Sequence, residues 1–190
     1  VLLSNPDLMK RMYILARTGL VAAFLGIAAL MFFVDKTLWI YLWALYLLSA
    51  FFSKYYTAAP IKLAYRGLGE FSVWFAFGPM AVAIASISQN LFPSGDMLLL
   101  FPATGLSTLS ILLIGQLIDV DADIQGGKHG AASRLGTRAT AFIYVFVQAA
   151  IMINVIAMSL CFSGKSVVLL AALLPYVLLF PGSAVGAVRH

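Results

Sequence analysis

Three of the chain's seven carboxylates stand within five residues, Asp119, Asp121 and Asp123, at the end of a hydrophobic run. A spacing of four residues puts Asp119 and Asp123 on one face of a helix, whereas Asp121 points roughly opposite. Two like charges on one face repel each other unless a cation joins them, and Mg²⁺ is commonly held by one or two carboxylates with water and phosphate oxygens. The spacing makes Asp119 and Asp123 candidate catalytic residues and magnesium ligands. The alternative, a solvated helix end, is disfavoured by the helix macrodipole.

Polar residues on both sides of the carboxylates extend this candidate site. Gln116 precedes Asp119 by three residues on the same face, where it could hold a metal-bound water. Lys128 and Arg134 follow in the next loop and could neutralise the oxygens of a bound diphosphate, Arg134 through its bidentate guanidinium. The competing interpretation is that these cations only mark the cytoplasmic side of a membrane protein. His129 is interpreted as an ordinary loop histidine rather than a base.

A second polar concentration is the loop at 54–70, which contains three tyrosines, three cations and one carboxylate. Tyrosines near a membrane surface ordinarily form an aromatic belt. If the loop folds over the aspartates, it can instead close on a shared anionic headgroup through Tyr56, Lys62 and Arg66. These three residues are therefore candidates for catalysis and substrate binding.

The elements that position these residues are transmembrane helices. Apolar residues make up 63% of the 190 and charged residues only 10%, with a mean hydropathy of +1.01. A water-soluble domain carries roughly a quarter charged residues, so lipid must be the solvent here. Because a helix of about 20 apolar residues crosses the bilayer, we predict one all-α, multi-pass bundle with six hydrophobic helices. The predicted segments are 13–34, 38–53, 71–88, 97–118, 141–162 and 167–188, the last interrupted by Pro175 and Pro181.

The distribution of basic residues predicts how these helices are oriented. Six crossings put ten of the twelve Lys and Arg residues on one side of the membrane, and only Lys36 and Lys165 on the other. By the positive-inside rule, both termini and both polar loops are expected in the cytoplasm. The net charge of +5 then reflects topology, and no nucleic-acid partner is implied. The expected location is the cell membrane or an inner membrane.

Two sets of motifs carry a resemblance to a known family. The sequence reads Y-T-A-A-P at 56–60, Y-R-G-L-G-E at 65–70 and F-G-P at 77–79. It then reads D-x-x-x-D at 119–123, G-K at 127–128 and R-L-G at 134–136. In this order the motifs resemble the UbiA superfamily of intramembrane prenyltransferases. They look most like the branch that prenylates 1,4-dihydroxy-2-naphthoate on the way to menaquinone.

The resemblance implies an enzyme with a fold of about nine helices around a cavity that opens to lipid. Two aspartate-rich motifs would hold Mg²⁺ and the diphosphate of a polyprenyl donor, and an electron-rich ring of an aromatic acceptor would attack the prenyl carbon. In this sequence the second of those motifs corresponds to Asp119 and Asp123. We accordingly expect catalysis from Asp119, Asp123, Lys62 and Tyr56, and substrate binding by Arg66, Gln116, Lys128 and Arg134.

The chain departs from the family pattern in three ways. The family's first aspartate-rich motif, N-x-x-x-D-x-x-x-D, is not found before the first helix, Gln116 and Ile118 replace the usual Asn and Arg, and six helices fall short of nine. We therefore expect a single prenyltransferase-like domain, 1–190, that is incomplete at both ends. Two alternatives stay open: a tetrapyrrole prenyltransferase of the chlorophyll-synthase type, and a non-catalytic subunit of a larger membrane complex.

Overall fold

The computed structural model describes residues 6–161, and this part of the chain is helical, with no strand. Five stretches are long and apolar enough to cross a membrane. They are α1 (Pro6–Leu30), α2 (Trp39–Tyr55), the run from α3 (Gly69–Phe75) through η3 (Ala76–Met80) to α4 (Ala81–Ile87), α6 (Leu100–Ile118) and α9 (Thr137–Cys161). The predicted all-α multi-pass architecture is confirmed for these residues. The sixth predicted segment, 167–188, lies outside the described residues.

The remaining elements are short and connect the long helices. They are the turns η1 (Lys36–Leu38) and η2 (Leu63–Tyr65) and the helices α5 (Gly95–Leu98), α7 (Val120–Gln125) and α8 (Ala131–Leu135). Three predicted boundaries were wrong by four or more residues, one of them the end of the first helix, which lies at Leu30 instead of 34. The first helix begins at Pro6 instead of 13, and the fifth at Thr137 instead of 141. In both cases the polar residues Lys10, Arg11 and Arg138 belong to the helix and extend it beyond the apolar run.

Close packing of small residues brings the end of α3 and η3 alongside the first part of α6. A Cβ on Gly78 would lie 2.9 Å from the Phe101 carbonyl oxygen, and one on Gly105 would lie 2.7 Å from the Trp74 carbonyl oxygen. Membrane helices can approach each other closely where glycine or another small residue stands at their contact. Around Pro79, which has no amide hydrogen to donate, the chain passes through the wider π-helical turn η3. These contacts hold α3–η3–α4 against α6 along their length.

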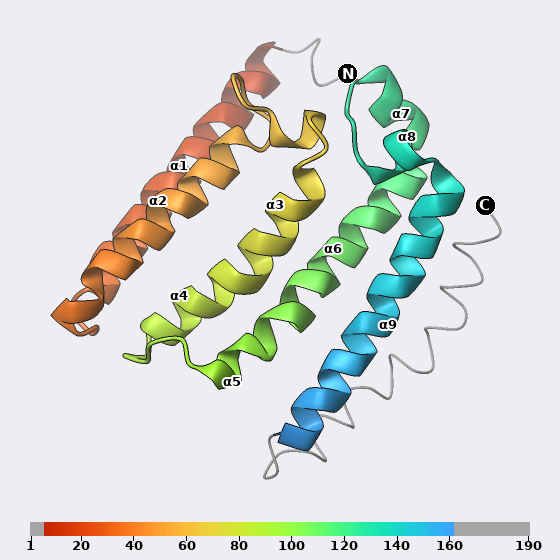
Figure 1. Ribbon diagram of the computed structural model, residues 1–190. Helices are drawn as coiled ribbons and strands as arrows, with labels where there is room; N and C mark the ends of the chain where they lie inside the picture. The colour runs from red at the N-terminus through yellow and green to blue at the C-terminus, as the bar shows by residue number, and fades with distance from the viewer. Residues whose placement is uncertain (1–5, 162–190) are drawn as a thin grey trace.

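The other long helices pack in sequence order (Figure 1). Helix α1 lies on α2, and α9 lies on α6 around a buried cluster of Leu113, Tyr144, Val147 and Ile151. Many large apolar side chains on the outside remain exposed, for example Phe146 at 74% and Ile111 at 72%. Such a surface is suited to lipid. The protein is therefore an integral membrane protein.

Both polar segments lie at the same end of the bundle, the upper end in Figure 1. The loop 56–68 joins α2 to α3 there, and α7 and α8 follow α6 at that end. At the opposite end, Asn90, which follows α4, links that end of α4 to the connection between α1 and α2. Its side chain accepts a hydrogen bond from the Asp35 amide at 2.7 Å and donates one to the Phe33 carbonyl at 3.0 Å. The fold thus gathers the candidate site residues at one end.

Candidate active site

A break in the helix at Asp119 separates the three aspartates from α6. Helix α6 ends at Ile118, Asp119 has φ −101° and ψ 16°, and α7 begins at the next residue. The Asp119 carbonyl still accepts a hydrogen bond from the Asp123 amide at 2.8 Å. The environments of the side chains nevertheless differ, because Asp119 and Asp121 are exposed whereas the Asp123 side chain is only 17% exposed.

Asp123 forms an ion pair with Lys128. The distance from Lys128 Nζ to Asp123 Oδ1 is 2.8 Å, and the Lys128 amide donates to the Asp123 carbonyl at 2.9 Å. The chain turns back between them through Gly127, whose φ of +70° lies in the left-handed region that glycine enters without a steric penalty. The hydrogen bond to Asp123 raises the pKa of the Lys128 ammonium above its usual value, although partial burial acts in the opposite sense. Lys128 is therefore a stable cation at this end of the bundle.

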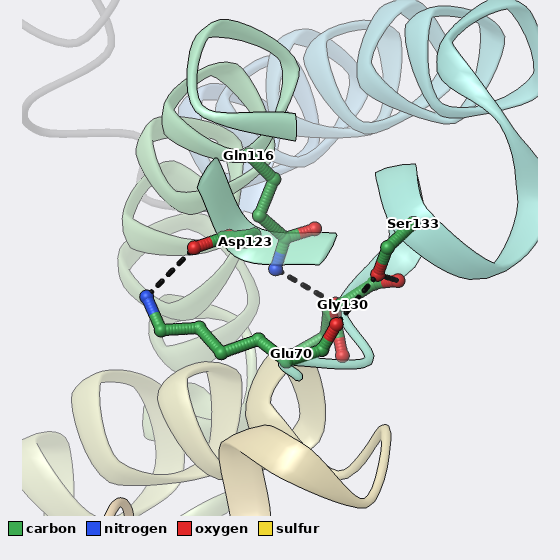
Figure 2. A network of polar contacts seen from close by, with 6 residues as sticks. Glu70, Gln116, Asp123, Gly130 and Ser133 are labelled. Atoms are coloured by element: carbon green, nitrogen blue, oxygen red, sulfur yellow. Dashed lines mark hydrogen bonds and ion pairs between the residues drawn. The ribbon is translucent and has the colours of Figure 1, made fainter. Parts of the chain in front are cut away.

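Glu70 joins three segments through one oxygen atom (Figure 2). Its Oε1 accepts a hydrogen bond from Gln116 Nε2 at 2.8 Å. The same atom accepts another from the Ala131 amide at 2.7 Å. Gln116 is only 9% exposed and its Oε1 has no hydrogen-bond partner among the described residues. The backbone of Gly130 lies against the Gln116 amide so closely that a Cβ there would be 2.7 Å from Nε2. The α6 end, the α7–α8 turn and the start of α3 are thereby fixed together.

A polar cavity of about 80 Å³ lies where these segments meet. It is bordered by residues from both polar segments, and the carboxylates among its described lining residues are Glu70 and Asp123. The lining residues are Tyr56, Thr57, Ala64, Gly69, Glu70, Leu112, Gln116, Asp123, Lys128 and Gly130. The fold therefore brings four predicted site residues, Tyr56, Gln116, Asp123 and Lys128, to one cavity.

Tyr56 follows the last residue of α2 and also borders a second, larger cavity. Burial, and then the negative charges of Glu70 and Asp123, raise the pKa of its phenol, with Lys128 acting in the opposite sense. The second cavity has a volume of about 450 Å³ and lies between α2 and α3–η3. Its lining is mostly apolar: Ser49, Phe52, Ser53, Tyr56, Ser72, Val73, Ala76, Phe77 and Met80. A neutral tyrosine thus stands between a charged cavity and an apolar one.

The other predicted cations do not border the polar cavity. Lys62 Nζ lies 5.5 Å from the centre of the Tyr65 ring, and Arg66 Nη2 donates to the Pro60 carbonyl at 3.1 Å. Arg134 lies over Gly67 and borders a separate cavity of about 270 Å³ that also contacts Glu70. All three cations are exposed. They lie at the same end of the bundle as the cavity but outside its lining.

The donor set fits a magnesium ion that keeps part of its shell for water or phosphate. Asp123 supplies one carboxylate at the cavity, and Mg²⁺ requires only one or two from the protein. Gln116 lines the same cavity, and its buried Oε1 has no hydrogen-bond partner among the described residues. Residues 6–161 contain no group of three or more His, Cys, Asp and Glu side chains able to hold a metal. Pairing of Asp119 with Asp123 in one site stays a prediction.

Glu70 and Gly130 are the site residues that the sequence did not single out. The role of Glu70 depends on contacts with residues 46 and 61 positions away, and that of Gly130 depends on its close approach to Gln116. The sequence feature that could have pointed to Glu70 is its position at the end of the Y-R-G-L-G-E run, next to Gly69. A Cβ on Gly69 would lie 3.5 Å from the Tyr56 hydroxyl oxygen, so this run packs directly against the cavity.

Known proteins match part of this chain. The "UbiA prenyltransferase domain-containing protein 1" of Dictyostelium discoideum is 35% identical over 89 residues, which is 47% of this chain and 27% of that protein. The chloroplastic "2-carboxy-1,4-naphthoquinone phytyltransferase" of Arabidopsis thaliana is 34% identical over 142 residues, 67% of this chain and 37% of that protein. The "1,4-dihydroxy-2-naphthoate octaprenyltransferase" of Mycobacterium tuberculosis is 34% identical over 89 residues, 47% of this chain and 30% of that protein.

These matches confirm the resemblance to UbiA-type prenyltransferases, and in particular to those whose names refer to naphthoquinone or naphthoate. The matched part of the chain spans only 27% to 37% of the length of these relatives. No family model and no solved structure matches the chain.

Proposed function

We propose that this chain is the site-bearing part of an intramembrane prenyltransferase. It would transfer a polyprenyl group from its diphosphate to a naphthoate-type aromatic ring in lipid-quinone biosynthesis. The observation that carries the proposal is the position of Tyr56 between two unlike cavities, one lined by Asp123 and Lys128 and one largely apolar. Such an arrangement suits a ligand with a charged head and an apolar body.

The polar cavity is the proposed position of the diphosphate. When the diphosphate binds, the Lys128 ammonium would leave its ion pair with Asp123 and contact the phosphate oxygens instead. There it would stabilise the negative charge that develops as the diphosphate leaves. Asp123, together with Asp119 as predicted from their spacing, would hold Mg²⁺, and the metal would supply further charge neutralisation. Arg66, Arg134 and Lys62 lie at the same end and are proposed to contact the outer phosphate oxygens.

The apolar cavity is the proposed position of the reacting carbon. Phe52 and Phe77 line it, and aromatic faces stabilise a nearby cation such as an allylic one. A ring carbon of the acceptor would bond to the prenyl carbon as the bond to the diphosphate oxygen breaks. The ring would then regain aromaticity by losing a proton or carbon dioxide. Tyr56, with its raised phenol pKa, would remain neutral and donate a hydrogen bond to the diphosphate.

The test is a transfer assay with the protein in native membranes. Geranylgeranyl diphosphate and 1,4-dihydroxy-2-naphthoate are supplied with Mg²⁺, and the prenylated product is quantified by mass spectrometry. We expect product formation that Asp123→Asn abolishes and Asp121→Asn leaves largely intact. Transfer to a tetrapyrrole such as chlorophyllide, without transfer to the naphthoate, would assign the other acceptor class. Absence of product with both acceptors would favour the non-catalytic subunit.

A further inference from the structure

The start of α8 depends on a side chain that lies 61 residues earlier in the sequence. The first amides of any helix have no partner within it and must be satisfied from outside. The N-cap residue of α8 is Gly130, which has no side chain that could accept a hydrogen bond from these amides. Instead, Glu70 accepts the Ala131 amide at 2.7 Å. The orientation of the α7–α8 turn is therefore set by α3.

The same oxygen also fixes the amide of Gln116. Gln116 lies on the last turns of α6, 9% exposed, and donates to Glu70 Oε1 at 2.8 Å. Because the Gly130 backbone lies against this amide, the position of Gln116 determines how closely the turn approaches α6. Hydrogen bonds to an ionised acceptor are stronger than neutral ones, so this double contact resists displacement.

The turn that Glu70 anchors also carries Lys128. Ser133 Oγ donates to the carbonyls of Lys128 and Gly130, both at 3.0 Å, and this ties the turn to α8 as a unit. Any shift of the Ala131 amide would thus be transmitted to Lys128 and to its ion pair with Asp123. Among the described residues, no hydrogen bond reaches the second oxygen of Glu70.

We propose that Glu70 is a positioning residue: through Gln116 and the Ala131 amide it holds the Lys128–Asp123 turn against Tyr56 and so sets the diphosphate side of the cavity. This inference rests on the proposed function for its kinetic consequence. Its structural part is independent of that function. Glutamine at position 70 retains an oxygen that can accept both hydrogen bonds, whereas alanine retains none.

The experiment compares Glu70→Gln and Glu70→Ala in lipid nanodiscs by hydrogen–deuterium exchange, resolved at the Ala131 amide. We expect the exchange rate at Ala131 to rise at least about tenfold in Glu70→Ala and to change less than about threefold in Glu70→Gln. The matched control is Gln148→Ala. Gln148 is a buried polar residue, as Gln116 is, but its hydrogen bond goes to Tyr144 on its own helix. The exchange rate at Ala131 should therefore be unaffected. Unchanged exchange in Glu70→Ala, or an equal rise in both Glu70 variants, would overturn the proposal.

Kinetics separate positioning from direct participation. With geranylgeranyl diphosphate and 1,4-dihydroxy-2-naphthoate, Glu70→Ala should raise the KM for the diphosphate about tenfold and leave the KM for the naphthoate unchanged, while Glu70→Gln restores the wild-type value. If Glu70→Gln keeps Ala131 protected yet loses as much activity as Glu70→Ala, Glu70 acts on the ligand and the positioning role is wrong. If no variant, nor the wild type, transfers a prenyl group, the exchange data still decide the structural part, and it is the proposed function that fails.

Discussion

Gly130 lies flat against the side-chain amide of Gln116, so that a Cβ on residue 130 would be 2.7 Å from both Cδ and Nε2. The φ of Gly130 is −72°, which any residue can adopt, so glycine is needed here for space rather than for backbone freedom. The contact joins the α7–α8 turn to α6. It therefore offers a test of the site that involves no charged group.

Gly130→Ala should disrupt the site by steric overlap. Overpacking of this kind typically costs about 1–3 kcal/mol, and we expect a loss of thermal stability in that range together with weaker prenyl transfer. The double variant Gln116→Ala/Gly130→Ala should recover stability relative to Gly130→Ala, because the truncated side chain vacates the space. Gly115→Ala is the matched control, since a Cβ at Gly115 meets nothing within 4 Å. Equal losses in the two glycine variants would show that the contact with Gln116 is unimportant.

The aspartates should differ in their contributions to catalysis. Asp119→Asn and Asp123→Asn are each expected to reduce the transfer rate at least about 100-fold, a loss of about 2.7 kcal/mol in transition-state stabilisation. Asp121→Asn should cost far less, since the four-residue spacing pairs Asp119 with Asp123 and leaves Asp121 on the other side of the helix. Initial rates at saturating substrates provide the measurement. A small effect of Asp119→Asn beside a large one of Asp123→Asn would restrict the metal site to Asp123 and water.

The raised pKa of the Tyr56 phenol predicts a loss of stability at high pH. Above about pH 10 the tyrosine of the unfolded chain ionises while the folded one still holds its proton, so the unfolded state binds fewer protons and stability falls as pH rises. The melting temperature of the wild type in micelles should therefore decline more steeply between pH 9 and about pH 11 than that of Tyr56→Phe. Parallel declines would mean that Tyr56 titrates alike in both states.

Both polar loops are expected to face the cytoplasm. Cysteines introduced at Lys62 or Gly127, after Cys161→Ser, should react in sealed cells with a membrane-permeant maleimide and resist an impermeant one. Lys36, at the opposite end of the bundle, provides the matched position that the impermeant reagent should label. Labelling of residue 62 or 127 from outside would reverse the orientation.

The helices could be predicted from the sequence because the bilayer imposes a length of about 20 apolar residues on each. The details of the site depend on contacts that no local pattern specifies. The break at Asp119 occurs although residues 116–125 include no glycine or proline, and it leaves Asp119 in a different environment from Asp123. Likewise, Lys62 and Arg66 are placed by their contacts with Tyr65 and Pro60, outside the cavity lining. Spacing along a helix predicts neighbours only while the helix continues.

The hydrogen bonds of Asn90 have a mechanical consequence for the apolar cavity between α2 and α3. They pin the α1–α2 connection to the end of α4, on the side of the membrane away from Tyr56. Asn90 has φ +60°, a conformation that asparagine tolerates better than most residues. The two hydrogen bonds therefore form with little backbone strain. Because these bonds hold that end of α2, a rotation of α2 away from α3 would have its pivot there. The 17 residues of α2 make a lever about 25 Å long, so a rotation of about 5° would move Tyr56 by about 2 Å and widen the apolar cavity towards the site.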